Sequence, residues 1–279
     1  MRIHFIGDIS KDFNVIRGQT REEPGGGVFH NSMTAAAIGA DVVAVITCAP
    51  EDRGITAPIA AKNVPIVFCG SGRSTTTIEN VYPDENPDSR RSRLIAGATP
   101  FEPGDFDAVS GGVIHVNPLW YPLFSMDILA GLRQKAELLA ADAQGFLRNI
   151  AADGSMYLKV PPDVERGLAL LDVLKVDIKE AAALTGIDDV EPAARAVRAM
   201  GPRIVVLTHA DGVCVFDGSR IYEAPFGKYP MEGRTGRGDT CSAAFLCALA
   251  RGGDTAAATE FAGRITSSKL QYPGPYRGD

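Results

Sequence analysis

The chain lacks the segments that mark membrane, secreted and nucleic-acid-binding proteins. None of its apolar runs reaches the length of about 18 residues that a membrane-spanning helix needs. The N-terminal MRIHFIGDIS has no basic stretch followed by a long apolar one, as a secretion signal would have. The formal net charge is −6 and the lysines and arginines are scattered, which disfavours a surface that follows phosphates. We therefore expect a cytoplasmic protein with no membrane and no nucleic-acid partner.

Several signatures of cofactor and metal sites are also missing. The sequence has no GxxxxGK string followed by Ser or Thr and no GxGxxG after a strand, which argues against a P-loop enzyme and a typical dinucleotide binder. It has no HExxH motif and no CxxC pair, so a zinc site is not expected. The cysteines lie mostly in apolar runs and are expected to be reduced core residues, with a disulfide or a zinc site as the weaker alternative. They are Cys48, Cys69, Cys214, Cys241 and Cys247.

Short apolar runs alternate with helical patterns along most of the chain. The runs are bounded mostly by Gly, Pro or Asp, and this rhythm predicts a mainly parallel sheet with helices on both faces. The predicted strands begin at Ile3, Asp41, Val64, Gly112, Ala136, Leu171 and Arg203. The predicted helices span residues 31–38, 57–62, 126–134, 179–184 and 191–200, and a hairpin from Gly212 and helices over 239–251 and 254–269 follow.

Two polar segments interrupt this rhythm. Residues 13–25 and 74–98 are rich in polar side chains, and TTTIENVY in the second segment alternates in character. Such segments favour extended strands outside the main sheet over crossover helices. We predict one α/β domain over residues 1–279 in which these two segments form a small β lid. An exposed strand edge of this lid could serve as the contact of a homodimer.

The loop GRTGRGDT, residues 233–240, carries the most chemical information. Its glycines precede a helix of small and apolar residues, so main-chain N–H groups at the helix start can face an anion, and the helix dipole adds positive potential. A carboxylate at position 239 would repel a bound phosphate. Its presence is explained if Asp239 accepts the proton of an attacking hydroxyl, as the catalytic carboxylate of kinases does. The alternative is that Asp239 only caps the helix. Spacing alone does not decide between the two.

TGRGD, which ends at Asp239, resembles the C-terminal signature DxTGAGD of the ribokinase-like, or PfkB, family of carbohydrate kinases. The resemblance implies an α/β three-layer sandwich with a mostly parallel central sheet and a small β lid. It also implies Asp239 as the catalytic base and the amides of Gly236, Arg237 and Gly238 as an anion hole. Gly233 stands where the family usually has Asp, and Arg237 where it usually has Ala. Arg237 could therefore reach the donor phosphates or face solvent.

Two N-terminal segments resemble the acceptor-binding parts of the same family. GGGVFHN, which ends at Asn31, resembles the GGxxxN motif, and the likeness assigns Gly26, Gly27 and Asn31 to the acceptor. A glycine loop that caps the following helix would explain the same residues. Asp12 lies where the family holds substrate hydroxyls, just beyond the first strand. Asp8 is a second candidate, and either carboxylate could instead be a solvated turn residue.

Two further segments resemble the donor side of the family site. DIKE, residues 177–180, resembles the NxxE motif that organises magnesium, with Asp177 in place of Asn, and it implies Asp177 and Glu180 as oxygen donors for Mg²⁺. Acidic residues at a helix start also complement the helix dipole, which is the structural alternative. LTHADGVCVF resembles the TxGxxG segment near the nucleotide, which implies Thr208 and Gly212 in binding ATP.

Together these likenesses imply a kinase that moves the γ-phosphate of ATP to a hydroxyl of a sugar or polyol, with Mg²⁺ as cofactor. The closing FAGRITSSKLQYPGPY is similar to some members that include the inositol-kinase branch. A nucleoside kinase of the same family is an alternative, with Phe29, Tyr82 and Phe101 as aromatic residues near the lid. A non-catalytic ligand sensor on the same scaffold is another, which the departures at Gly233 and Arg237 favour.

Overall fold

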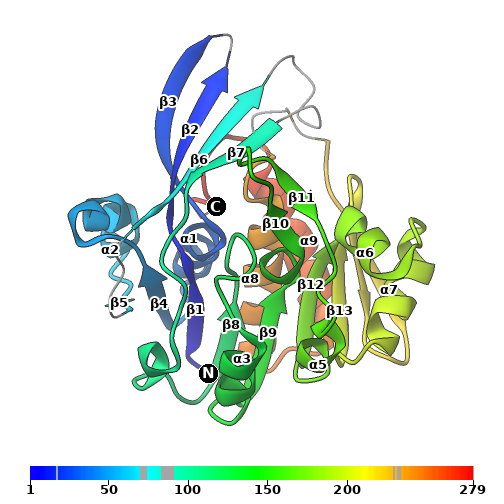
Figure 1. The fold of residues 1–279 in the computed structure, drawn as a ribbon. Helices are drawn as coiled ribbons and strands as arrows, with labels where there is room; N and C mark the ends of the chain where they lie inside the picture. The colour runs from blue at the N-terminus through cyan, green and yellow to red at the C-terminus, as the bar shows by residue number, and fades with distance from the viewer. Residues whose placement is uncertain (17, 70–73, 83–90, 229, 231–233, 279) are drawn as a thin grey trace.

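A nine-stranded sheet forms the middle layer of the protein, in the strand order β15-β14-β13-β12-β9-β8-β1-β4-β5 (Figure 1). The structure is a computed structural model and describes residues 1–16, 18–69, 74–82, 91–228, 230 and 234–278. The strands from β13 to β5 are parallel, and β14 and β15 add an antiparallel pair at one edge. Their bounds are β1 Ile3–Asp8, β4 Val42–Thr47, β5 Ile66–Phe68, β8 Val113–Val116, β9 Leu138–Asp142, β12 Val173–Asp177, β13 Ile204–Thr208, β14 Gly212–Phe216 and β15 Ile221–Pro225.

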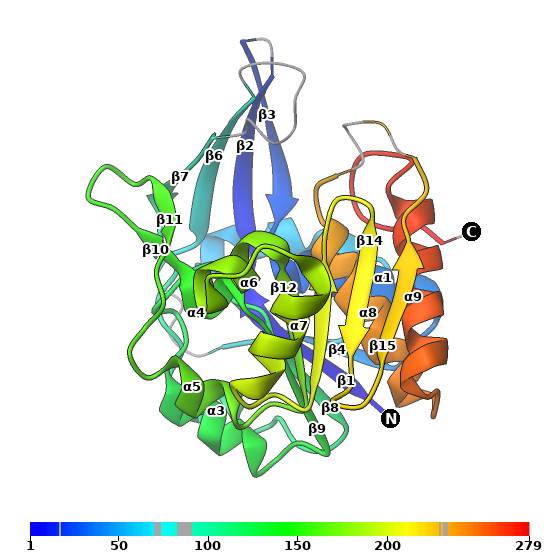
Figure 2. The same cartoon turned by 90° about the vertical axis from the view of Figure 1, so that its right-hand side faces the viewer.

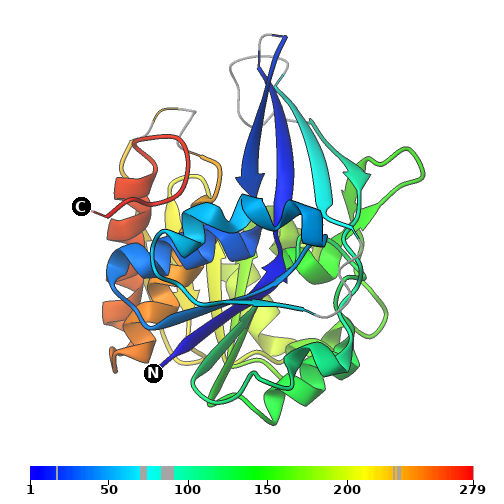
Figure 3. The ribbon, with the colours of Figure 1, turned by 90° about the vertical axis from the view of Figure 1, so that its left-hand side faces the viewer.

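Helices cover both faces of this sheet, as Figure 2 shows. Alternate residues of a strand point to opposite faces, so Ile3 and Phe5 of β1 pack into one apolar core and Ile6 packs into the other. The helices of the first core are α1 Gly27–Ile38, α2 Ala57–Ala60, α8 Arg237–Ala250 and α9 Thr255–Lys269, and Figure 3 shows α1, α8 and α9 over this face. Those of the second are α3 Met126–Arg133, α4 Gln144–Leu147, α5 Val164–Leu168, α6 Ile178–Thr185 and α7 Val190–Ala199.

The predicted α/β fold with a mostly parallel sheet and helices on both faces is confirmed. Each predicted strand is present and begins at the predicted residue or one or two residues later. The sequence pattern gave no sign of α4 and α5, because helices of four and five residues are too short to show a 3.6-residue period. It also missed a hairpin of two three-residue strands, β10 Arg148–Ile150 and β11 Met156–Leu158.

A second sheet of four strands, in the order β3-β2-β6-β7, rises above the carboxyl ends of the parallel strands (Figure 1). It contains β2 Ser10–Ile16, β3 Gln19–Gly25, β6 Thr76–Tyr82 and β7 Arg91–Ala96, which come from the two segments in which extended strands are predicted. Residues 83–90 of the second segment lie outside the described residues. We call this sheet the lid.

The lid is tied to the main sheet through a buried carboxyl group at the end of β1. Asp8 has no exposed surface, and its Oδ1 atom accepts a hydrogen bond from the N–H of Leu119 at 2.8 Å. Its Oδ2 atom accepts one from the hydroxyl of Thr76 in β6. Burial raises the pKa of Asp8 to about 6, although both hydrogen bonds oppose the shift. Asp8 therefore joins the two sheets, and the structure does not bring it into the pocket described below.

All five cysteines are buried with free thiols. Among the residues that the structure describes, no helix combines the length and the apolar character needed to cross a membrane.

Candidate active site

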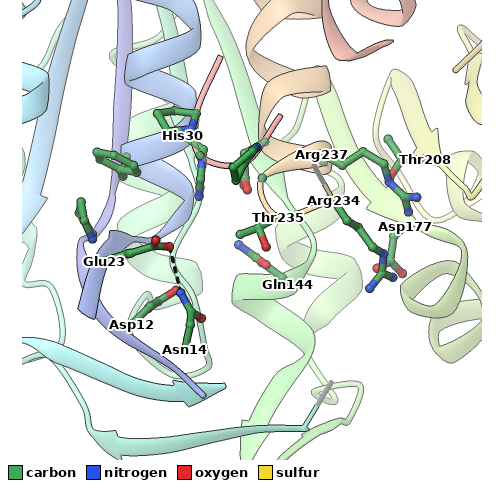
Figure 4. A pocket seen from close by; sticks show the side chains of 18 of the residues that line it. Asp12, Asn14, Glu23, His30, Gln144, Asp177, Thr208, Arg234, Thr235 and Arg237 are labelled. Atoms are coloured by element: carbon green, nitrogen blue, oxygen red, sulfur yellow. Dashed lines mark hydrogen bonds between the residues drawn. The ribbon is translucent and has the colours of Figure 1, made fainter. Parts of the chain in front are cut away.

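The carboxyl ends of the parallel strands open into a pocket of about 650 Å³ between the main sheet and the lid. A smaller pocket of about 300 Å³ adjoins it and shares part of its lining. Figure 4 shows two ends, with lid side chains at one and arginines of the glycine loop at the other. The lid end is formed by Asp12, Asn14 and Glu23, and the arginine end by Asp177, Thr208, Arg234 and Arg237.

Asp239 lies in the first turn of α8 and lines both pockets. The turn before it is of type II, because Gly236 has φ 79° and ψ 11° and the N–H of Arg237 donates to the carbonyl of Arg234 at 3.1 Å. A Cβ atom on Gly236 would also lie only 2.5 Å from Nδ1 of His30. Both the backbone angle and the close approach therefore require glycine at position 236.

The main-chain amides around this turn differ in their availability. Those of Gly236 and Gly238 have no hydrogen-bond partner among the described residues. The amide of Arg237 donates to a carbonyl inside the turn. Of the three amides predicted to form the anion hole, two are therefore available to bind an anion. Figure 4 shows the Arg237 side chain extending toward Thr208, at the arginine end of the pocket. Gly233 lies outside the described residues.

Two buried asparagines hold the start of α8. Asn117 follows β8, and its Nδ2 atom donates to Oδ1 of Asp239 at 2.8 Å and to Oδ1 of Asn31 at 2.9 Å. The Nδ2 atom of Asn31 donates to the carbonyl of Asp239 at 2.8 Å and to the hydroxyl of Ser242 at 3.1 Å. Asn31 is fully buried and links α1 to α8, so its contact with an acceptor stays a prediction. A Cβ atom on Gly27 would overlap the Asn117 amide, which explains this glycine.

A chain of hydrogen bonds fixes the orientation of the Asn117 amide. Nε2 of Gln144 donates to Oδ1 of Asn117 at 2.7 Å, and the guanidinium of Arg148 donates to Oε1 of Gln144 at 2.9 Å. Arginine only donates, so each amide in turn presents its oxygen to the donor before it and its nitrogen to the next acceptor. The direction of the chain therefore leads to a donated hydrogen bond at Asp239.

Asp12 lines both pockets from β2, close to the predicted acceptor glycines. The hydroxyl of Ser10 donates to Oδ1 of Asp12 at 2.6 Å. A Cβ atom on Gly25 would overlap the Asp12 carboxylate, so this glycine makes room for it. Gly26 and Gly27 line the smaller pocket, and Gly26 has a φ of 99°. Asp12, Gly26 and Gly27 thus lie together at the pocket, as the acceptor role would require.

A row of polar side chains crosses the lid on the side of the pockets. The hydroxyl of Ser92 donates to Oδ1 of Asn80 at 2.6 Å, and Nδ2 of Asn80 donates to Oδ1 of Asn14 at 3.2 Å. Nδ2 of Asn14 donates to Oε2 of Glu23 at 3.1 Å (Figure 4). These four residues come from four neighbouring strands, and each lines one of the two pockets. The lid therefore presents amide, hydroxyl and carboxylate groups to a ligand.

A buried lysine lies beneath the start of α8. Lys175 of β12 is 6% exposed, and its Nζ atom is 3.1 Å from Oδ2 of Asp142 and 4.0 Å from Oε2 of Glu180. Burial lowers its pKa, but the surrounding carboxylates, Asp142 first, outweigh burial and raise the pKa above the ordinary lysine value. A Cβ atom on Gly238 would lie 2.7 Å from Nζ. The Lys175 ammonium therefore adds positive charge beside the Gly238 amide.

Asp177 and Glu180 cap α6 reciprocally. The N–H of Glu180 donates to Oδ1 of Asp177 and the N–H of Asp177 donates to Oε2 of Glu180, both at 2.8 Å. Burial raises the pKa of Glu180, and the neighbouring Asp177 raises it further. Two crowded carboxylates that line the same pocket suit a partly hydrated Mg²⁺, which binds few protein oxygens directly. The described residues contain no cluster of three or more metal-ligating side chains, so such an ion would depend on water and substrate oxygens.

His30 forms part of the pocket wall. It is 6% exposed and lines both pockets, and its Nδ1 atom has no hydrogen-bond partner within the described part of the chain. Burial lowers its pKa, so the ring is neutral near pH 7. The side chain is thus buried beside the glycine loop, against Gly236.

The predicted nucleotide-binding residues are only partly at the pocket. Thr208 ends β13 and lines the arginine end. Gly212 begins β14 and is not among the described residues that line either pocket. A Cβ atom on Gly212 would be 2.6 Å from the carbonyl oxygen of Ala224, so its glycine is explained by the packing of β14 on β15.

Sequence reasoning missed several residues of this site, which are Asn14, Glu23, Asn80, Ser92, Asn117, Gln144, Arg148, Lys175 and Arg234. Two of them carried a signal that could have been used. Lys175 is a charged residue inside the apolar run LDVLKVD, and Asn117 directly follows a buried strand, where ligands of parallel sheets bind. The others sit in polar segments where no single residue stands out.

Comparison with known proteins agrees with this architecture. The sequence model described as "pfkB family carbohydrate kinase" matches residues 3–278. A pyrophosphate-dependent kinase in the ribokinase family, solved with a pyrophosphate analogue and myo-inositol, is 40% identical with a TM-score of 0.92, over 99% of this chain and 97% of that chain. A pyrophosphate-dependent myo-inositol-1 kinase, converted into a myo-inositol-3 kinase by replacing an asparagine and a serine with leucine, is 39% identical with a TM-score of 0.91, over 99% and 95%.

A curated relative gives a more limited match. The cytidine kinase of Thermococcus kodakarensis is 32% identical over 99 residues, which are 34% of this chain and 36% of that protein. The chain thus matches about a third of the length of this relative. The family match covers nearly the whole chain and, together with the two solved structures, shows to which family the protein belongs. The protein belongs to the pfkB family of carbohydrate kinases and is a phosphotransferase of the ribokinase-like fold.

Proposed function

We propose that this protein transfers a phosphoryl group from inorganic pyrophosphate to a hydroxyl of a cyclic polyol of the inositol type, with Asp239 as the general base. One observation carries the proposal: Asp239 lines both pockets, where the polar row of the lid approaches the cationic groups around the glycine loop. A hydroxyl held at the lid end can thus meet a phosphate held at the arginine end.

The polar row of the lid supports a polyol as the acceptor. Asn14, Asn80 and Ser92 have groups that both donate and accept hydrogen bonds, as a ring with many hydroxyls requires. The related myo-inositol kinase changed its product when an asparagine and a serine became leucine. This chain carries a hydrogen-bonded asparagine and serine, Asn80 and Ser92, at the smaller pocket.

A nucleoside acceptor has less support from the geometry. Phe29 and Tyr82 line the larger pocket, but Phe101 packs against Phe106 and Phe124 in the core, at ring-centroid distances of 5.5 and 5.8 Å. Stacking of a base would need an aromatic face at the acceptor position. The two pockets offer mainly amide, carboxylate and guanidinium groups there instead.

The proposed phosphoryl donor, pyrophosphate, differs from the ATP that the family resemblance implies. Two relatives of about 40% identity are named as pyrophosphate-dependent. The arginine end of this chain carries Arg234 and Arg237, and Lys175 lies beneath it, so cationic groups are concentrated around the position of a small polyanion. Such charges bind phosphate oxygens directly and need no nucleoside for affinity. MgATP is kept as the alternative donor in the test below.

The proposed reaction is a direct displacement. The acceptor hydroxyl oxygen attacks the terminal phosphorus of pyrophosphate, its proton passes to Asp239, and the bridging P–O bond breaks to release inorganic phosphate. The amides of Gly236 and Gly238, with Lys175 beside the second, stabilise the negative charge on the transferring group. Asp177 and Glu180 would hold Mg²⁺, which neutralises donor charge when bound.

We infer that the lid excludes water from this reaction and that residues 1–279 act as one domain. Water at Asp239 would otherwise accept the phosphoryl group in place of the polyol. The edges of the lid are β3 and β7, and a homodimer through one of them remains a prediction.

A donor-by-acceptor matrix tests the proposal. Pyrophosphate or ATP, each with Mg²⁺, is combined with myo-inositol, fructose or cytidine, and ³¹P NMR follows the new phosphate ester. We expect ester formation with pyrophosphate and myo-inositol, and at least tenfold slower formation with the other pairs. Turnover with ATP and not with pyrophosphate would refute the donor, and turnover with cytidine alone would refute the acceptor.

A further inference from the structure

Lys269 is the last residue of α9 and is fully buried, at 0% exposure. Its Nζ atom donates a hydrogen bond to the main-chain carbonyl of Thr235, inside the glycine turn of residues 234–237. Burial of an ammonium group is costly, so the site must supply compensating interactions. The Thr235 carbonyl, the negative end of the α9 dipole and the carboxylate of Asp239 do so.

The hydrogen bond to Thr235 has a consequence on the other side of the peptide. In a trans peptide the C=O and the N–H point in opposite directions. The Thr235–Gly236 peptide is the central unit of the type II turn, and rotation of this unit by about 180° would give the type I turn. Because Lys269 holds the carbonyl of Thr235, the N–H of Gly236 points away from Lys269. Gly236 lines both pockets, and Lys269 is not among the described residues that do.

We propose that Lys269 is a positioning residue that fixes the Thr235–Gly236 peptide so that the Gly236 amide faces the transferring phosphoryl group, and that its charge favours a polyanionic donor. This inference rests on the proposed phosphoryl transfer at Asp239. It assigns to Lys269 a role in donor binding without contact with the donor. Lys269 is not expected to affect binding of the polyol at the lid end of the pocket.

The protonation of Lys269 gives a second readout. Burial lowers the pKa of Lys269 to about 8, although Asp239 of α8 opposes the shift. His30 of α1 also faces it and is neutral, because burial lowers the pKa of this ring and the Lys269 charge lowers it further. As the pH rises through about 8, Lys269 loses its positive charge. Its hydrogen bond to the Thr235 carbonyl then becomes weaker, and it no longer attracts anions. Activity should therefore decline on the alkaline side.

Three variants test the inference. Lys269→Met removes the charge and keeps a similar length, Lys269→Arg keeps a charge that does not titrate below about pH 12, and Lys62→Met removes an exposed lysine as the control. Binding of inorganic pyrophosphate alone is measured by calorimetry, and kcat and KM are measured for both substrates. Melting curves report folding.

We expect Lys269→Met to bind pyrophosphate at least tenfold more weakly and to lose about 100-fold in kcat, as the loss of one oxyanion donor does. The KM for the polyol should stay within twofold of that of Lys62→Met. In Lys269→Arg the alkaline decline of kcat should move above its wild-type position, and this holds as a test even where Lys269→Met does not fold.

Two results would overturn the inference. One is pyrophosphate affinity and kcat of a folded Lys269→Met within twofold of the control. The other is an unchanged alkaline decline in Lys269→Arg. Failure of the proposed function is distinguishable, because wild-type protein would then form no phosphorylated polyol from pyrophosphate. If wild-type protein uses MgATP, the same comparison is made with MgATP.

Discussion

The side-chain amide of Asn117 donates a hydrogen bond of 2.8 Å to Oδ1 of Asp239. The two residues are far apart in sequence, one after β8 and the other at the start of α8. The bond occupies one carboxylate oxygen and leaves Oδ2 to accept a proton from a hydroxyl. Orientation of a base contributes to rate without changing substrate binding.

Asn117→Ala should therefore lower kcat more than it changes either KM. We expect kcat to fall by about 10- to 100-fold, because the Asp239 side chain loses its fixed orientation. Steady-state kinetics with both substrates check this. A control is Asn149→Ala, since Asn149 lies in β10 and its side-chain amide donates to the main-chain carbonyls of Leu147 and Lys159. Equal effects in the two variants would contradict the positioning role of Asn117.

Replacing Asn80 and Ser92 together by leucine should alter how the polyol sits in the pocket. Both side chains belong to the polar row, and leucine can neither donate nor accept a hydrogen bond. We expect a different hydroxyl to be phosphorylated or the polyol KM to rise at least tenfold, with the pyrophosphate KM unchanged. Chiral separation of the phosphate esters identifies the product. The same product at the same polyol KM would show that this pair does not contact the acceptor.

Lys175→Met should weaken both donor binding and stability. The variant leaves Asp142 and Glu180 buried without their cation, which costs about 3–5 kcal/mol of unfolding free energy. The pyrophosphate KM should rise because the charge beside Gly238 is lost. Denaturant unfolding and kinetics measure the two effects. The exposed Lys179→Met provides the matched control, and equal stability of the two variants would argue against the buried ion pair.

Asp8 should make stability depend on pH. Its folded pKa of about 6 lies above the ordinary value of 3.8, so the folded state binds more protons between these values and its stability falls as the pH rises through this window. The difference between the two pKa values corresponds to a loss of at most about 3 kcal/mol in the free energy of unfolding. Asp8→Asn should therefore gain stability over wild type at pH 7 and gain little at pH 4. Asp163→Asn, at an exposed position, is the control, and a difference from wild type that is the same at both pH values would contradict the prediction.

Local sequence patterns were sufficient to predict the main sheet and the anion-binding character of the loop at Asp239. Apolar runs bounded by turn residues mark buried strands, and glycines before a small-residue helix mark an anion-binding helix start. The resemblance to the pfkB family then assigned Asp239, Asp12, Glu180 and Thr208 to the site, and the structure brings them to one pocket. Their catalytic and binding roles remain predictions.

Long-range contacts could not be read in the same way. Asn31 was assigned to the acceptor because it follows a glycine motif, but its hydrogen bonds to Asp239, Ser242 and Asn117 depend on how α1, α8 and β8 pack. Lys269 looked like the ordinary end of a helix, and its burial depends on the path of the glycine loop. Local periodicity contains no information on such pairings.

The most direct test of the account is the turnover of Asp239→Asn with pyrophosphate and myo-inositol, set beside its calorimetric affinity for pyrophosphate. Asparagine keeps the shape of the side chain but cannot take the proton of the attacking hydroxyl. We predict a loss of at least about 1,000-fold in kcat, in line with the contribution of a general base, while pyrophosphate still binds. Turnover of Asp239→Asn within tenfold of wild type would contradict the assignment of Asp239 as the base.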